Sequence, residues 1–189
     1  MSFDFHKTYN GVGKKIDFSK KYIVVMQHAV TNEYGLSKNQ ILETYRAIIK
    51  SNLQTIWFWP NSDAGSFEIS KILRIKRELN KKELGKIFFV KNMAPEHFLE
   101  LVNLSAGVLG NSSTAIRECS YLGVPCINIG SRQNGREMSV NVTSVDYNKD
   151  KIFNLIKKKF FYKKSKNFDK LYGDGKAASK IVKIISRLL

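Results

Sequence analysis

Short apolar runs alternate with longer amphipathic segments along most of this chain. The apolar runs are rich in β-branched and aromatic residues and end at turn-forming residues, which predicts buried strands. These strands are expected at Tyr22–His28, Thr55–Trp59, Lys86–Val90, Gly107–Gly110 and Pro125–Gly130. Apolar positions three and four residues apart predict amphipathic helices between and after the strands. The helices are expected at Ser37–Ser51, Ser66–Leu79, from Pro95 onward, after Gly110 and at Lys149–Phe161.

Strands and helices that take turns are typical of a parallel sheet covered by helices, so we predict an α/β fold. In such sheets, ligands bind beyond the carboxyl ends of the strands. All five expected strands are followed by hydrogen-bonding side chains. These are Gln27-His28, Pro60-Asn61-Ser62-Asp63, Lys91-Asn92, Asn111-Ser112-Ser113 and Ser131-Arg132-Gln133. Each group is ordinary loop chemistry by itself, but five at one rim favour a crevice for a polar ligand.

The C-terminal part has a different pattern. Lys176–Leu189 carries apolar residues at helical spacing, so this segment needs a partner surface. We therefore expect three parts: an N-terminal arm at 1–20, an α/β domain at 21–165, and a linker with a C-terminal helix at 166–189.

Charge is strongly unbalanced. The 189 residues include 32 Lys and Arg against 16 Asp and Glu, a formal net charge of +16. Lysines cluster at Lys157-Lys158-Lys159 and Lys163-Lys164. Such a balance suits nucleic acid, an anionic membrane surface or an anionic small substrate, and it is equally typical of a solvated lysine-rich surface. No nucleic-acid-binding motif accompanies it, so nucleic acid is the less favoured partner.

Cysteine usage and hydropathy indicate the compartment. Cys119 and Cys126 lack the spacing of metal ligands, which favours a reduced environment. The first residues have no apolar core of the signal-peptide type, and no apolar run is long enough to cross a membrane. We therefore expect a soluble, cytoplasmic protein with no membrane partner.

The stretch Gly110-Asn111-Ser112-Ser113-Thr114-Ala115-Ile116-Arg117-Glu118 has two interpretations. Its serines can bind an anion together with the free N–H groups of a helix start, or they can simply cap that helix. No candidate cap has a glutamate three residues further on, so the reciprocal capping box is absent. Glu118 lies about 6 Å along the helix from Thr114, at about 1.5 Å per residue. Its carboxylate could accept from ribose hydroxyls while the serines hold phosphate.

Five further positions are candidates for the same rim. Arg132 and Arg136 offer planar donor groups suited to phosphate, or they belong to a solvated loop. His28 is the histidine at a strand end, where it is either structural or a donor to an oxyanion. Asn61 and Asp63 could bind sugar hydroxyls, although capping of the following helix is the simpler role on physical grounds.

Five motifs together resemble the C-terminal half of the hydrolysing UDP-N-acetylglucosamine 2-epimerases. The resemblance covers roughly residues 20 to 185, nearly the whole chain. The motifs are QHAVTNE (27–33), PNSDAGS (60–66), GNSSTAIRE (110–118), GVPCINIGSRQNGRE (123–137) and LYGDGKAASKI (171–181). Non-hydrolysing relatives usually have DSGGIQEE and DTTERPE at the third and fourth motifs, so the hydrolysing branch is favoured.

The resemblance implies a GT-B architecture of two Rossmann-like halves with the active site between them. This chain would be the half that grips the UDP part, with a C-terminal crossover helix. His28 matches a catalytic position of the family, and the other matches are substrate-binding: Asn61, Asp63, Ser112, Ser113, Glu118 and Arg132. Ser112 and Ser113 match the diphosphate-binding serines, and Glu118 matches the ribose-binding glutamate. The implied reaction eliminates UDP from UDP-N-acetylglucosamine to give a glycal, and water then adds to give N-acetylmannosamine, a sugar of sialic-acid-type biosynthesis. It needs no nicotinamide cofactor and no metal.

Two departures qualify that expectation. The chain reads GREMSVNV at 135–142 where the family commonly has a Gly-rich stretch such as GRETGENV. The family's N-terminal half, which carries acid and base groups, has no counterpart here. Proton transfer needs such groups, so we expect weak UDP binding and little turnover without an N-terminal domain, supplied in trans or through an oligomer. The alternatives are a non-catalytic remnant and a basic-surface binding or scaffold protein.

Overall fold

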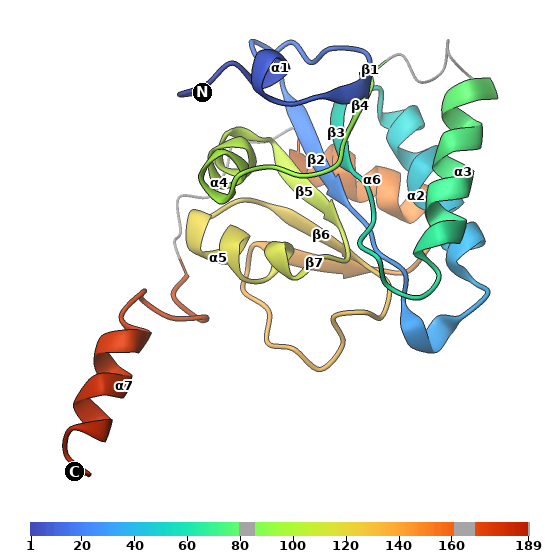
Figure 1. Cartoon of the computed structure of the whole chain (residues 1–189). Coiled ribbons are helices and arrows are strands. Elements are labelled where there is room, and N and C mark those ends of the chain that lie inside the picture. The colour runs from blue at the N-terminus through green and yellow to red at the C-terminus, as the bar shows by residue number, and fades with distance from the viewer. Residues whose placement is uncertain (80–85, 161–168, 189) are drawn as a thin grey trace.

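The computed structural model describes residues 1–79, 86–160 and 169–188 (Figure 1). The lysine pair Lys163-Lys164, the start of the link expected at 167–175 and the expected domain boundary at 165 lie outside the described residues.

A seven-stranded sheet forms the centre of the described chain. Its spatial order is β1-β4-β3-β2-β5-β6-β7, and neighbouring strands are parallel except for β1 with β4. The strands are β1 Gly11–Gly13, β2 Tyr22–Met26, β3 Gln54–Phe58, β4 Ile87–Val90, β5 Gly107–Gly110, β6 Cys126–Ile129 and β7 Val142–Val145. From β2 the chain first builds β3 and β4 on one side and then β5, β6 and β7 on the other. The sheet therefore has a topological switch point between β2 and β5, where ligands of such folds bind.

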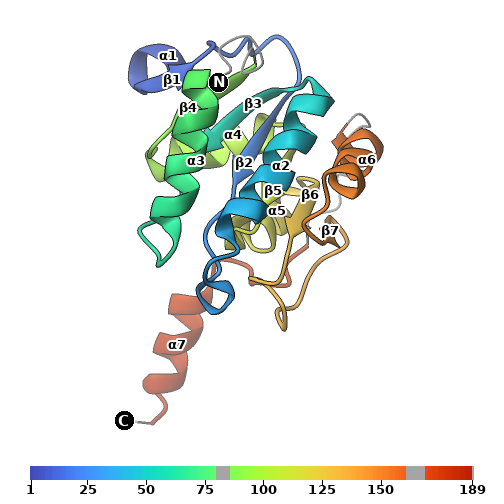
Figure 2. The same ribbon diagram turned by 90° about the vertical axis from the view of Figure 1, so that its right-hand side faces the viewer.

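Helices cover both faces of the sheet (Figure 2). One face packs against α2, α3 and α6, and the other packs against α1, α4 and α5. The helices are α1 Phe5–Thr8, α2 Ser37–Ser51, α3 Ser66–Leu79, α4 Pro95–Leu104, α5 Glu118–Leu122, α6 Lys149–Phe160 and α7 Ala177–Ile185, with 3-10 turns η1 Thr31–Glu33 and η2 Ser113–Ala115. The predicted α/β class is confirmed, with both bounds of α2 and α3 as expected.

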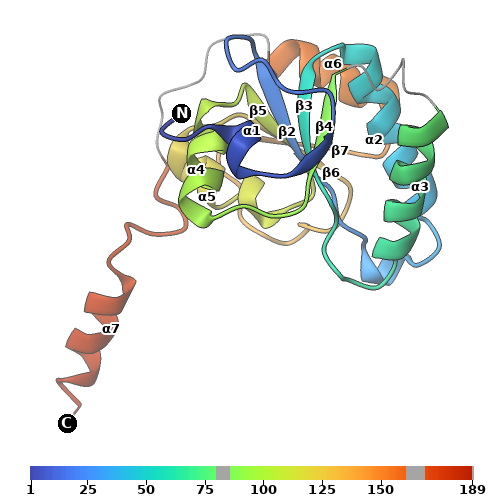
Figure 3. The ribbon, with the colours of Figure 1, turned by 45° about the horizontal axis from the view of Figure 1, so that its top comes forward.

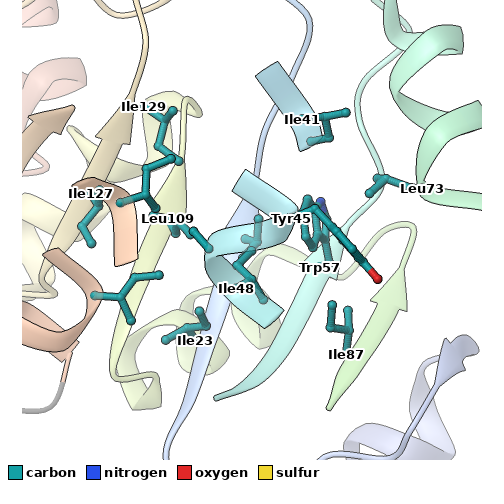
Figure 4. Packing of buried hydrophobic residues seen from close by; sticks show 14 of the residues in the cluster. Ile23, Ile41, Tyr45, Ile48, Trp57, Leu73, Ile87, Leu109, Ile127 and Ile129 are labelled. Atoms are coloured by element: carbon teal, nitrogen blue, oxygen red, sulfur yellow. The ribbon is translucent and has the colours of Figure 1, made fainter. Parts of the chain in front are cut away.

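The two cores explain why the strands read as continuous apolar runs. Successive side chains of a strand point to opposite faces. Ile23 therefore packs with α2, α3 and α6, while Val24 packs with the helices on the other face. In the first core, Tyr45 and Ile48 of α2 lie close to Trp57 of β3 (Figure 4). Since both faces are covered, the central strands carry no alternation of apolar and polar residues.

The apolar pattern does not predict the two edge strands, β1 and β7. β1 reads Gly-Val-Gly, in which two of the three residues are glycines, a type depleted in strands. A side chain at Gly11 would place its Cβ atom 2.3 Å from the Phe88 ring, so glycine is what allows this strand to approach β4. β7 is four residues long and half-exposed, too short for a period to be recognised.

The N-terminal arm folds back onto the sheet (Figure 3). Phe5 is buried in the second core at 1% exposure. The Gln54 side chain pins the arm, because its Oε1 accepts from the Asp17 N–H at 2.7 Å and its Nε2 donates to the Asp17 carbonyl at 2.9 Å. Tyr9 adds a contact to α4 through its hydroxyl, 2.7 Å from His97 Nδ1.

The predicted C-terminal helix is present as α7 and stands apart from the rest of the described chain (Figure 1). Its apolar side chains are 50–62% exposed at Ile181, Val182, Ile184 and Ile185. Among the described residues, no helix is both long enough and apolar enough to span a membrane.

Candidate functional site

The carboxyl ends of β2, β3, β5 and β6 bring five side chains together at the topological switch point. We call this group the rim cluster; its members are His28, Asn61, Asp63, Asn111 and Arg132. All five were named from the sequence as rim residues, and four of them were given a candidate role. Parallel strands that end at one edge of a sheet place side chains from distant parts of the chain within contact distance.

His28 follows β2 and is buried, with 4% of its surface exposed. Its Nδ1 accepts a hydrogen bond from the backbone N–H of Asn61 at 3.2 Å. A neutral ring that accepts at Nδ1 carries its proton on Nε2. The pKa of His28 is lowered to about 4, first by burial and then by the positive charge of Arg132, while Asp63 opposes the shift. His28 is therefore a neutral hydrogen-bond donor at pH 7.

Arg132 and Asp63 form a half-exposed ion pair at the rim. The distance from Arg132 Nη2 to Asp63 Oδ2 is 3.4 Å. Arg132 Nη1 also donates to the carbonyl of Asn111 at 3.3 Å. Both charged side chains line a hollow of about 640 Å³ together with Ala29, Ser131 and other residues of the adjoining loops. The pair leaves donor groups of the guanidinium available for an anion.

A second hollow of about 290 Å³ lies beside the first. His28, Asn61 and Lys91 line it, and its apolar walls include Phe58 and Phe98. A flat apolar wall next to hydrogen-bonding groups is the usual composition of a site for a small polar ligand with a ring.

The serines of the GNSSTAIRE motif lie where a cap is needed. Ser112 is the N-cap of η2, and its Oγ accepts from the N–H of Thr114 at 3.3 Å. The expectation of one helix that starts at the motif is wrong: η2 ends at Ala115 and α5 begins only at Glu118. A single 3-10 turn has a smaller dipole than a long helix, so an anion here would depend on direct N–H and hydroxyl donors. Ser113, which is half-buried, leaves its hydroxyl for that purpose.

Glu118 lies in a separate hollow of about 460 Å³. The C-terminal segment lines its other wall with Asp169, Tyr172 and Asp174, and Tyr172 donates to the carbonyl of Glu137 at 2.6 Å. Glu118 Oε2 is buried and has no hydrogen-bond partner among the described residues. The structure therefore gathers His28, Asn61, Asp63 and Arg132 around one point and leaves Glu118 in a neighbouring hollow.

Sequence reasoning named Asn111 and Gln133 as rim residues without giving either a role. Asn111 is fully buried and hydrogen-bonds to His28, and Gln133, 1% exposed, donates to the Asn111 carbonyl at 2.7 Å. The signal in the sequence that could have pointed to these roles was a polar residue directly after a buried strand. No three His, Cys, Asp or Glu side chains group as a metal site within the described ranges.

Comparison with known proteins identifies relatives. The family model described as UDP-N-acetylglucosamine 2-epimerase matches residues 3–186. The chain is 30% identical over 172 residues to the UDP-N,N'-diacetylbacillosamine 2-epimerase (hydrolyzing) of Legionella pneumophila, covering 91% of this chain and 44% of that protein. It is 32% identical over 137 residues to the UDP-N-acetylglucosamine 2-epimerase of Neisseria meningitidis, covering 72% and 35%. The chain spans less than half the length of these relatives.

Solved structures share the fold. The UDP-GlcNAc 2-epimerase of Methanocaldococcus jannaschii, in complex with UDP-GlcNAc and UDP, aligns with a TM-score of 0.69 and 20% identity, covering 90% of this chain and 47% of that chain. The enzyme from Neisseria meningitidis bound to UDP-GlcNAc aligns with a TM-score of 0.65 and 18% identity, covering 91% and 46%. At this identity the likeness establishes the fold: a Rossmann-like α/β unit of the GT-B type.

Proposed function

The chain belongs to the UDP-N-acetylglucosamine 2-epimerase family, and from this premise we propose that it is the UDP-sugar-binding half of a hydrolysing member. The proposed overall reaction converts UDP-N-acetylglucosamine and water to N-acetylmannosamine and UDP. The observation that carries the proposal is the rim cluster, where a neutral histidine, an arginine and an amide meet at the switch point. The Legionella relative, whose name includes the hydrolysing activity, supports the branch.

The proposed roles follow from the chemistry of each side chain. In the first step the C1–O bond to UDP breaks while a base removes the C2 proton, so negative charge develops on the departing diphosphate. Arg132 and the Nε2–H of His28 are donors suited to that charge. The hydroxyl of Ser113 adds a further donor, with Ser112 holding the turn in place.

Two residues are assigned to the parts of the ligand that do not react. Asn61 and Asp63 are proposed to bind the sugar, next to His28 and Arg132. Glu118 is proposed to accept from the ribose hydroxyls through its unpartnered Oε2, since a buried carboxylate oxygen without a donor is costly until a ligand supplies one.

The proposed domain organisation assigns a docking role to α7. Residues 21–165 form the nucleotide-sugar-binding unit, and the segment 166–189 docks its exposed apolar side chains on the second domain of the enzyme. The acid and base groups that move protons at C2 belong to that domain in this proposal. We therefore expect UDP binding, but little turnover, from these residues alone.

Calorimetric titration with UDP tests the binding role. We expect saturable binding, at least about tenfold weaker after Arg132→Ala, because charge-assisted hydrogen bonds contribute about 1.5–3 kcal/mol. Arg77→Ala is a matched control, since this arginine lies on α3 and pairs with Glu78. Undetectable binding at millimolar UDP would contradict the proposal.

Turnover is tested by mixing the chain with the N-terminal domain of a relative. Release of UDP from UDP-N-acetylglucosamine should exceed that from either part alone. UDP-N,N'-diacetylbacillosamine is the second substrate to offer, because the names of two relatives include that sugar. If the mixture releases no UDP from either compound, the enzymatic role is wrong.

One observation favours a second candidate function, a basic-surface binding protein. Lys14, Lys15, Lys20, Lys21 and Lys86 line a hollow of about 470 Å³, in which Asp17 is the acidic lining residue. Clustered lysines attract phosphates in a salt-dependent way. Oligonucleotide binding that weakens steeply with salt and does not change when UDP is added would favour this function over the epimerase.

A further inference from the structure

The Asn111 side chain continues the pairing of β2 and β5 beyond the end of the backbone ladder. The ladder reaches Met26 opposite Gly110, and the Asn111 N–H donates to the Met26 carbonyl at 3.0 Å. Gly110 has a φ of +134°, so the main chain turns away at this point. The Asn111 amide then takes its place: Oδ1 accepts from the His28 N–H at 2.7 Å, and Nδ2 donates to the His28 carbonyl at 2.9 Å.

The backbone carbonyl of the same residue holds the opposite side of the site. It accepts from Arg132 Nη1 at 3.3 Å and from Gln133 Nε2 at 2.7 Å. Asn111 is 0% exposed, and Gln133 is 1% exposed. The contact with Gln133 is thus shielded from water, which makes it costly to break.

The contacts close into a ring. Asn111 holds His28 and Arg132, Arg132 pairs with Asp63 at 3.4 Å, and the backbone of Asn61 donates to His28 Nδ1 at 3.2 Å. Asn61 and Asp63 belong to the same loop after β3, so this loop links the contact to His28 with the contact to Arg132.

We propose that Asn111 is the positioning residue that fixes His28 and Arg132 relative to each other, and so sets the geometry in which a UDP diphosphate is held. This inference rests on the proposed function for the identity of the ligand. The chemistry requires an asparagine: one side chain must both accept from an N–H and donate to a C=O of the same residue. Aspartate has the acceptor without the donor, and serine is too short to span both groups.

Asn111→Asp tests this role with an isosteric change. The new carboxylate keeps the His28 N–H contact, loses the donor, and places a negative charge near the imidazole, whose other charged neighbours are Arg132, Asp63 and Lys91. We expect the His28 pKa, measured by NMR on a chain with three histidines, to rise by at least about one unit. UDP affinity should fall at least about tenfold. Asn128→Asp is the control, because Asn128 is equally buried but donates to Ser144 on β7.

Asn111→Ser provides a second variant if the aspartate chain does not fold. In it the protection of the His28 amide against hydrogen exchange should drop, with UDP binding weakened as before. An unchanged His28 pKa in Asn111→Asp, or unchanged amide protection in Asn111→Ser, overturns the positioning role. Both NMR measurements are made without UDP, so they decide on Asn111 even if the wild-type chain fails to bind UDP and the proposed function is wrong.

Discussion

Burial determines the charge state of His28. A histidine whose pKa drops from 6.5 to about 4 on folding binds its proton more readily in the unfolded chain. Between these two pH values the unfolded state therefore takes up a proton that the folded state excludes. Stability rises with pH wherever the unfolded state binds more protons, so acidification from pH 6.5 to 4 removes stability.

The first prediction concerns that pH range. His28→Gln removes the titrating group, while the backbone bonds to Asn111 can remain. Urea denaturation of both chains at pH values between 7 and 4 measures the free energy of unfolding. This free energy should fall more in the wild type than in the variant, by up to about 3 kcal/mol. Two curves that run parallel over this range would show that burial does not depress the His28 pKa.

Residue positions in the site were predictable to different degrees. The sequence predicted a rim position for four residues that follow directly after buried strands, because the carboxyl ends of parallel strands share one edge of the sheet. These residues are His28, Asn61, Asp63 and Arg132. The role of Asn111 was not predictable, since it depends on which strand lies next to β2. That neighbour is β5, after which Asn111 lies 83 residues from His28 along the chain, and periodicity carries no information on strand order.

At the scale of an element, β5 depends on a glycine that faces α6. A Cβ atom at Gly107 would lie 2.2 Å from the ring of Phe160, which is fully buried. The strand and helix can pack closely only because that side chain is missing. Overpacking of this kind costs typically about 1–3 kcal/mol.

The second prediction is that Gly107→Ala lowers the free energy of unfolding by about 1–3 kcal/mol, measured by urea denaturation. Combining it with Phe160→Leu should recover part of this free energy, because the smaller side chain relieves the steric clash with the new methyl group. A double variant in which the two losses simply add would mean that Phe160 is not the cause.

The N-terminal arm supplies a third prediction. The Tyr9 hydroxyl accepts from the N–H of Ala94 at 3.1 Å and lies 2.7 Å from His97 Nδ1. Tyr9→Phe removes both hydrogen bonds and should cost about 1–2 kcal/mol in urea denaturation. Tyr34→Phe is the control, since Tyr34 is 81% exposed, and an equal effect of both changes would contradict the assignment.

Element boundaries were predictable where the apolar period is long. α2 and α3 each hold their period for about four turns, and both bounds agree with the structure. The segment after Gly110 is different, because Ala115 and Cys119 pack into the core from a broken helix. Local spacing there suits both a continuous helix and η2 followed by α5, and tertiary packing decides between them.

At the scale of the whole molecule, the α/β class followed from the order of elements along the chain. The position of α7 did not follow, because its amphipathic pattern predicts a partner surface without naming it. No residue of α7 is buried within the described chain. Its contribution to the stability of the sheet and its helices should therefore be small.

The fourth prediction tests that separation. Deletion of residues 176–189 should change the free energy of unfolding by less than about 0.5 kcal/mol, the usual range for surface changes. Urea denaturation of both chains measures it, with tryptophan fluorescence reporting from Trp57 in the core. A clear drop in the midpoint would show that α7 packs on the sheet domain in solution.

The way His28 is held has a consequence for engineering. Asn111 grips the main chain at position 28 through the N–H and C=O that every residue except proline possesses. The backbone contacts of position 28 therefore do not depend on its side chain, whereas the Asn61 N–H needs an acceptor such as the imidazole Nδ1. Imidazole analogues with other acidities could be installed there by genetic code expansion, which would allow the chemistry of the site to be titrated one substituent at a time on an unchanged backbone.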